Sequence, residues 1–150
     1  MKLTGPGHIP VLSEAKSRIC FGTVTDQGLP FYSGNLVYET KVEAEEDCEA
    51  IITVPAYRGA LVKIVLDGKD SGVIVHGPYQ AAVHLEKGSH IIGIRLYGNR
   101  NNTFGSFHNC NPTDIYYGPS HWLARGKSWT YRYLLKDMGI MKAPVIELLR

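Results

Sequence analysis

The 150-residue sequence lacks the patterns that mark several large classes of protein. No apolar run approaches the ~18 residues that a membrane-spanning helix needs, and residues 1–6 have no apolar core of the kind found in signal peptides. Sixteen Lys and Arg residues and 14 Asp and Glu residues are scattered, so the formal net charge of +2 forms no basic stripe. We therefore expect no nucleic-acid partner and no membrane partner, and a cytoplasmic location if the chain is complete.

Catalytic and metal-binding motifs are missing as well. Three cysteines without a CxxC pair predict free thiols rather than a disulfide framework or a zinc site. The six histidines show no HxH or HExxH spacing, and there is no GxSxG elbow or glycine-rich phosphate loop. We therefore assign no catalytic residue, no metal ligand and no cofactor, although a structural calcium ion held by loop oxygens stays open.

Carboxylate pairs need separate attention, because a glycosidase requires two carboxylates beside the bond it cleaves. Two pairs fall in predicted turns, where Asp commonly shapes the backbone, and two further carboxylates stand alone in the sequence. These residues are Asp67 with Asp70, Glu45 with Asp47, Asp114 and Asp137. We expect structural roles for them, and hence no enzyme in this chain by itself.

Short alternating runs dominate the rest of the sequence. Alternation with a period of two predicts a half-buried strand over residues 31–44, whose inward side would carry Tyr32, Leu36, Tyr38, Thr40, Val42 and Ala44. Further strands are predicted at 50–54, 60–66, 73–76, 81–85, 92–97, 129–135 and 140–148, with a hairpin connection over 67–72. Seven to nine short strands between turns predict an all-β fold, an antiparallel β-sandwich or jelly roll.

The expected domain organisation is simple. Residues 1–19 would form an irregular lead-in, with a short helical turn near residues 13–18. Residues 20–150 would form a single β-sandwich domain, which at this length needs no disulfide or metal for its stability.

Five segments carry a resemblance to a known family: GLPFYSG at 28–34, YRGA at 57–60, LDGK at 66–69, GNRNNTFG at 98–105, and residues 129–144. Over about residues 20–148 the chain resembles the galactose-binding-like jelly-roll domain near the C-terminus of large bacterial glycoside hydrolases, the α-L-rhamnosidase-like and β-galactosidase-like enzymes. The resemblance implies two antiparallel sheets and an accessory role, either sugar binding or packing against a catalytic domain. It places catalysis in another domain.

Aromatic and polar residues in predicted loops are the candidates for carbohydrate binding. Sugars are bound by an aromatic ring against their C–H face and by side chains that hydrogen bond to their hydroxyl groups. The candidates are Tyr57, Arg58, Tyr79, Arg100, Asn101, Asn102, His108 and Trp122. We expect Trp129, Tyr131 and Tyr133 to fill or flank the core instead, because they alternate in a predicted strand.

The loop at residues 99–108 leaves three interpretations open. Its Asn and Gly residues could serve turn geometry while Phe104 and Phe107 plug the edge of the sandwich. Its Arg and aromatic residues could dock on another protein, or the same groups could contact sugar.

Three functional hypotheses follow. The first is a non-catalytic accessory domain of a carbohydrate-active enzyme, a glycoside hydrolase, which binds carbohydrate or packs on the catalytic module. The second is a free-standing carbohydrate-binding module. The third is a small glycosidase, which would need two carboxylates, or a His and a carboxylate, to converge in one pocket.

Overall fold

The computed structural model describes residues 18–111 and 118–149. Most of the predicted lead-in, its helical turn and Asp114 therefore lie outside the described residues. The chain divides into two compact units. The sandwich unit comprises residues 21–23, 34–99 and 138–150, and the loop unit comprises 1–20, 24–33 and 100–137. The single β-sandwich domain expected over residues 20–150 stays a prediction, and each of the two units is described by itself below.

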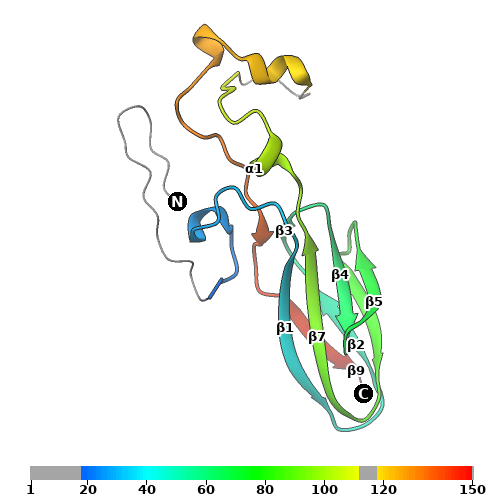
Figure 1. The fold of residues 1–150 in the computed structure, drawn as a ribbon. Helices are drawn as coiled ribbons and strands as arrows, with labels where there is room; N and C mark the ends of the chain where they lie inside the picture. The colour runs from blue at the N-terminus through cyan, green and yellow to red at the C-terminus, as the bar shows by residue number, and fades with distance from the viewer. Residues whose placement is uncertain (1–17, 112–117, 150) are drawn as a thin grey trace. The chain divides into compact units, whose positions relative to one another are not determined.

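Two antiparallel sheets make up most of the sandwich unit (Figure 1). The first sheet has four strands, in the order β1 (Leu36–Ala44), β7 (Gly88–Tyr97), β4 (Leu61–Leu66) and β5 (Lys69–Ile74). The second has three, in the order β6 (Gln80–Leu85), β2 (Cys48–Thr53) and β9 (Val145–Leu149). A small third sheet pairs β3 (Tyr57–Arg58) with β8 (Gly139–Ile140). The chain passes from one larger sheet to the other between β1 and β2, between β5 and β6 and between β6 and β7, whereas β4 and β5 form a hairpin within the first sheet.

The core lies between the two larger sheets. Alternate residues are buried in the central strands, as in Val62 and Ile64 of β4 or Ala50 and Ile52 of β2. The inner faces of the two sheets approach closely, because a Cβ added at Gly72 of β5 would lie 3.2 Å from Cβ of Ala81 in β6. The predicted fold class, an all-β antiparallel sandwich, is confirmed.

The hairpin between β4 and β5 is shorter than predicted. Leu66 pairs with Lys69, so the connection consists of Asp67 and Gly68 alone, and β5 begins at Lys69 rather than Val73. Both turn residues have positive φ, 48° and 81°, which is the backbone that a two-residue hairpin turn of the I′ kind requires. The twist of such a turn matches that of the two strands, so the strands pair from the first residue on either side of the turn.

The predicted strand at 129–135 is wrong. In this segment the structure has only an isolated bridge between Asn109 and Trp129. The alternating aromatic residues contact a ring of another loop: Trp129 and Tyr133 both meet the His108 ring, with centroids 5.2 Å and 4.8 Å away. Ring contacts between loops can produce a period of two without any strand partner.

Helices are short in both described ranges. The loop unit contains α1 (Asn101–Phe104) and three 3₁₀ helices, η1 (Thr25–Gln27), η2 (Pro119–Leu123) and η3 (Gly126–Ser128). None of the helices described is long and apolar enough to cross a membrane. Phe104 in α1 is exposed, and Phe107 contacts Phe31 and Tyr133 of its own unit.

Candidate functional site

Three of the candidate residues, Tyr57, Arg58 and Tyr79, meet in the sandwich unit. They line a hollow of about 300 Å³ whose wall consists of residues 55–60 together with Val75 and Tyr79. Tyr79 is 21 residues beyond Arg58 in the sequence, so the fold alone brings these side chains together. The hollow is at the lower end of the volume range of ligand pockets, so it has room for one or two rings of a ligand.

The strand β3 holds one side of the hollow. Tyr57 pairs with Ile140 of β8, and the carbonyl of Ala56 accepts a hydrogen bond of 2.9 Å from the backbone N–H of Met141. Beyond β3, the N–H of Ala60 donates to the carbonyl of Tyr97 at 2.7 Å. These backbone contacts fix the position from which the side chains of residues 57 and 58 project.

Gly59 allows this segment to lie directly on the end of β7. A Cβ at this position would be 2.6 Å from Cδ1 of Leu96 and 2.7 Å from the carbonyl oxygen of Tyr97. Since real Cβ atoms do not approach backbone oxygen this closely, only glycine fits without a shift of the chain. The glycine in the YRGA segment thus has a structural cause.

The two tyrosines of the hollow are arranged edge to face. Their ring centroids are 5.9 Å apart, with an angle of 88° between the planes. The Tyr57 hydroxyl donates to the carbonyl of Ile74 at 3.3 Å, and burial, aided by the neighbouring Tyr79, raises the pKa of Tyr57. The hydrogen bond holds the Tyr57 ring in place, and the raised pKa favours the neutral phenol.

Tyr79 has an unusual backbone for a bulky residue, with φ at 57°. Two hydrogen bonds hold it there: its N–H donates to the carbonyl of His76 at 3.2 Å, and its carbonyl accepts from the N–H of Val54 at 3.0 Å. The side chain is 43% exposed. Residues held in a sparsely populated conformation gather at binding sites, and here the backbone presents an aromatic ring to solvent.

Arg58 is the cation of the hollow. One Nη1–H donates to the carbonyl of Tyr57 at 3.2 Å, and the residue is exposed. In the described part of the chain no carboxylate pairs with it. Arg95 of the same unit, by contrast, lies 3.6 Å from a carboxylate oxygen of Asp70.

The candidates of the 99–108 loop lie elsewhere, in the loop unit. Asn102 is only 2% exposed, and both ends of its amide bond to Lys136: Oδ1 accepts from the backbone N–H at 2.9 Å and Nδ2 donates to the carbonyl at 2.7 Å. A buried amide engaged in this way cannot contact a ligand. Arg100 is exposed at the start of α1, and Asn101 lines a depression of about 450 Å³.

His108 and Trp122 share a third, smaller hollow of about 130 Å³ in the loop unit. The His108 ring stacks on Trp129, with centroids 5.2 Å apart, and its Nδ1 donates to the carbonyl of Thr130 at 2.8 Å. Trp122 is 61% exposed. Of the eight predicted site residues, Tyr57, Arg58 and Tyr79 thus line one hollow, His108 and Trp122 line another, and Asn101 lines a third, whereas Arg100 and Asn102 line none of the three.

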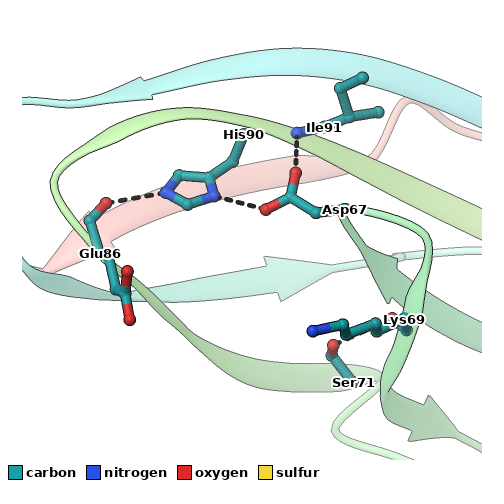
Figure 2. A network of polar contacts seen from close by, with 6 residues as sticks. All are labelled: Asp67, Lys69, Ser71, Glu86, His90 and Ile91. Atoms are coloured by element: carbon teal, nitrogen blue, oxygen red, sulfur yellow. Dashed lines mark hydrogen bonds and ion pairs between the residues drawn. The ribbon is translucent and has the colours of Figure 1, made fainter.

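A histidine–carboxylate pair that sequence reasoning missed lies in the sandwich unit (Figure 2). His90 donates from Nδ1 to Asp67 at 2.7 Å and from Nε2 to the carbonyl of Glu86 at 2.8 Å. The second oxygen of Asp67 accepts the N–H of Ile91 at 2.8 Å. These hydrogen bonds raise the pKa of His90 and lower the pKa of Asp67, with the His90–Asp67 bond the largest cause of each shift.

This pair braces two turns and has no ring nitrogen left for acid–base chemistry. With a hydrogen-bond acceptor at each nitrogen, the geometry favours the doubly protonated imidazolium. Asp70, the partner that the sequence suggested for Asp67, instead bonds to Lys63 at 2.6 Å. The sequence signal was present in the Asp67–Gly68 turn, but nothing local linked that turn to residue 90.

Metal ligands do not gather in the described ranges. Within residues 18–111 and 118–149, no three His, Cys, Asp or Glu side chains lie close enough together to hold a metal ion. The three cysteines are free thiols, of which Cys48 is buried in β2 and Cys20 is exposed. We assign no metal centre to these ranges.

Comparisons with known proteins were made for the whole chain. No family model matches it, and no curated protein does. Among solved structures, the chain is similar to part of a rhamnosidase from Novosphingobium sp. PP1Y, with 17% sequence identity and a TM-score of 0.49. The match covers 77% of this chain and 11% of the rhamnosidase, so the chain spans about a ninth of that protein's length.

Proposed function

We propose that this chain is a non-catalytic accessory domain of a carbohydrate-active enzyme, a glycoside hydrolase, and that it binds carbohydrate in the hollow of Tyr57, Arg58 and Tyr79. One observation carries the proposal: an exposed tyrosine ring, a fixed second tyrosine and an arginine converge from separate segments on one hollow. An aromatic ring with polar donors beside it is the combination that a sugar ring requires.

Each group has a distinct part in such binding. The exposed Tyr79 ring supplies a face for the C–H groups of the sugar, because its backbone fixes it toward solvent. Arg58 supplies donors to sugar oxygens, and the edge-to-face contact with Tyr57 keeps the Tyr79 ring in place. Because the rings and the backbone are held in advance, little conformational entropy is lost on binding.

The decisive experiment is binding of the full chain to a broad glycan array, followed by calorimetry on any hit. Tyr79→Ala removes the exposed ring, and we expect affinity to fall at least about tenfold, which corresponds to ~1.4 kcal/mol. Tyr131→Ala is the control, because Tyr131 is also an exposed tyrosine but belongs to the loop unit and does not line the hollow.

Two results would count against the proposal. Unchanged affinity of the Tyr79→Ala protein would place the sugar elsewhere. Silence across the array, with the protein shown to be folded by circular dichroism, would rule out carbohydrate binding and leave the docking role.

Packing on a catalytic module is the second candidate function, and exposed apolar side chains of the loop unit favour it. Phe104, Trp122, Leu123 and Tyr131 are each more than half exposed. Aromatic residues are enriched in the buried centres of protein interfaces. We therefore propose that the loop unit, rather than the sandwich unit, would make such contacts; Trp122→Ser should then weaken association with the catalytic module without affecting sugar binding.

A further inference from the structure

The charge of the hollow is of one sign. Its wall, residues 55–60 with Val75 and Tyr79, contains a single ionisable side chain that is charged at neutral pH, Arg58, and no carboxylate. The phenol of Tyr57 stays neutral, because burial raises its pKa. A ligand in the hollow therefore meets one positive charge and no negative charge from the wall.

Arg58 keeps most of its hydrogen-bonding capacity. A guanidinium group has five N–H donors, and one of them is used by the carbonyl of Tyr57 at 3.2 Å. Three other cations of the sandwich unit have carboxylate partners: Lys63 and Arg95 pair with Asp70, and Lys41 pairs with Glu43. The cation at the hollow is thus one that the described part of the protein leaves without a counter-charge.

The bond to the Tyr57 carbonyl also orients the guanidinium. Since it occupies Nη1, the edge formed by Nε–H and Nη2–H is the one that remains for a ligand. Two parallel N–H groups match the two oxygens of a carboxylate, which is the strongest pairing that arginine makes. A hydroxyl group of a neutral sugar would use only one of them.

We infer that the hollow selects acidic sugars, with the carboxylate of a uronic acid on Arg58 and the sugar ring against Tyr79. This inference rests on the proposed function and adds the class of ligand. Arg58 would contribute specificity, while Tyr79 would contribute affinity for acidic and neutral rings alike.

The test compares an acidic ligand with its methyl ester, which has the same sugar rings but no charge. Calorimetry of the full chain is carried out with trigalacturonate and with its fully methyl-esterified, uncharged form. We expect trigalacturonate to bind at least about tenfold more tightly, because a charge-assisted pair replaces a neutral contact. Raising the salt from about 0.05 M to about 0.5 M should weaken binding of the acid and leave that of the ester unchanged, since salt screens exposed charges.

Variants assign the effect to Arg58. Arg58→Gln keeps a hydrogen-bonding side chain but removes the charge, and it should abolish the preference for the acid. Arg95→Gln is the matched control, since it removes an arginine of the same unit that lies outside the hollow wall, and it should keep the preference.

The outcomes separate the inference from the function on which it rests. Equal affinity for the acid and the ester would overturn the acidic selectivity while leaving carbohydrate binding intact. A preference that survives in Arg58→Gln would overturn the assignment to Arg58. Failure of the folded protein to bind either trisaccharide or any array glycan would overturn both the function and the inference.

Discussion

The sandwich unit and the loop unit are each stabilised by different internal interactions. The sandwich unit buries an apolar core from both sheets, including Ile52, Ile64, Leu85, Ile92 and Leu96 at 0–1% exposure. In the described part of the loop unit, Val24 is the sole buried hydrophobic residue, and the other buried residues with side chains are Asn102 and Asn109. The first unit rests on a hydrophobic core with backbone ladders, whereas the second rests on specific hydrogen bonds and ring contacts.

Specific side chains therefore replace secondary structure in the loop unit. Asn102 bonds to the backbone of Lys136, and the Thr103 hydroxyl donates to the carbonyl of Phe31 at 2.8 Å. Tyr133 contacts the rings of Phe31 and His108, with centroids 5.1 Å and 4.8 Å away. Each contact joins segments far apart in the sequence, so the unit depends on few and individually important residues.

The two units can be followed separately in solution. Both tryptophans of the protein, Trp122 and Trp129, belong to the loop unit, and the strands belong to the sandwich unit. Tryptophan fluorescence thus reports on the loop unit, and far-ultraviolet circular dichroism reports mainly on the sandwich unit. The predictions below use this difference.

The largest expected effect comes from Ile52→Ala in the sandwich core. Ile52 is fully buried in β2, the middle strand of the second sheet, so its truncation should cost about 2–5 kcal/mol of unfolding free energy. Urea unfolding followed by circular dichroism measures the loss. Val37→Ala, on the exposed face of β1, is the control, and an equal loss there would show that the core is not where the structure places it.

Asn102→Ala should have the next largest effect, and it should appear in the loop unit. The change removes two hydrogen bonds and leaves the backbone N–H and C=O of Lys136 without this partner, at a cost of about 1–3 kcal/mol. We expect the fluorescence transition to shift more than the circular dichroism transition. Phe104→Ala, at an exposed position in the same helix, should shift neither; coincident shifts for Asn102→Ala would mean that the units unfold as one.

Tyr133→Leu tests the ring contacts of the loop unit. Leucine keeps an apolar side chain but loses the edge contact with Phe31 and the contact with His108, which should cost about 0.5–1.5 kcal/mol. Fluorescence-detected unfolding measures the effect. The control is Tyr131→Leu, because the Tyr131 ring is exposed. A larger loss of stability for Tyr131→Leu than for Tyr133→Leu would contradict the importance given to the ring contacts of Tyr133.

The smallest expected effect is the pH dependence of the brace between His90 and Asp67. The pKa of His90 is raised in the folded state, so its stabilising contribution is complete below about 6.5 and is lost as the pH rises through the higher folded value. The pKa of Asp67 is lowered, so its contribution is present above about 4 and is lost as the pH falls through the lower folded value.

Other charges facing the brace belong to the same balance. Glu86 and Asp67 favour the imidazolium, Lys69 lowers the pKa of Asp67, and Glu43 interacts with the charge of His90. Urea unfolding at a series of pH values, followed by circular dichroism, should show sandwich stability declining above about pH 6.5. His90→Asn should remove this decline, whereas the control His84→Asn, at an exposed position, should retain it. A decline that persists in His90→Asn would locate the titrating group elsewhere.

Sequence patterns predicted the sandwich unit well, because its structure follows from local properties. Alternation in residues 61–66 and 92–96 reflects one buried face, and the Asp67–Gly68 pair specifies a tight turn on its own. The same reasoning failed at 129–135, where Trp129 and Tyr133 make ring contacts with other loops. Alternation with a period of two indicates which residues share a face, but it does not indicate which part of the chain packs against that face.

The candidate site shows the same limit. Sequence reasoning named Tyr57, Arg58 and Tyr79 by residue type and loop position, and the structure adds that they share one hollow. It treated Asn102 as an equal candidate, although burial against Lys136 removes it from any ligand. Residue type indicates what a side chain can bind, whereas only neighbours decide whether it is exposed.

By itself, then, the sequence determined the all-β class, most of the strand positions and the kinds of side chain available for binding, because these follow from periodicity and turn chemistry over a few residues. The tertiary structure decided that the chain forms two units, that His90 braces the Asp67 turn, and that Tyr79 joins Tyr57 and Arg58. These features depend on contacts between residues that are at least 21 positions apart in the sequence, and no local pattern encodes such pairings.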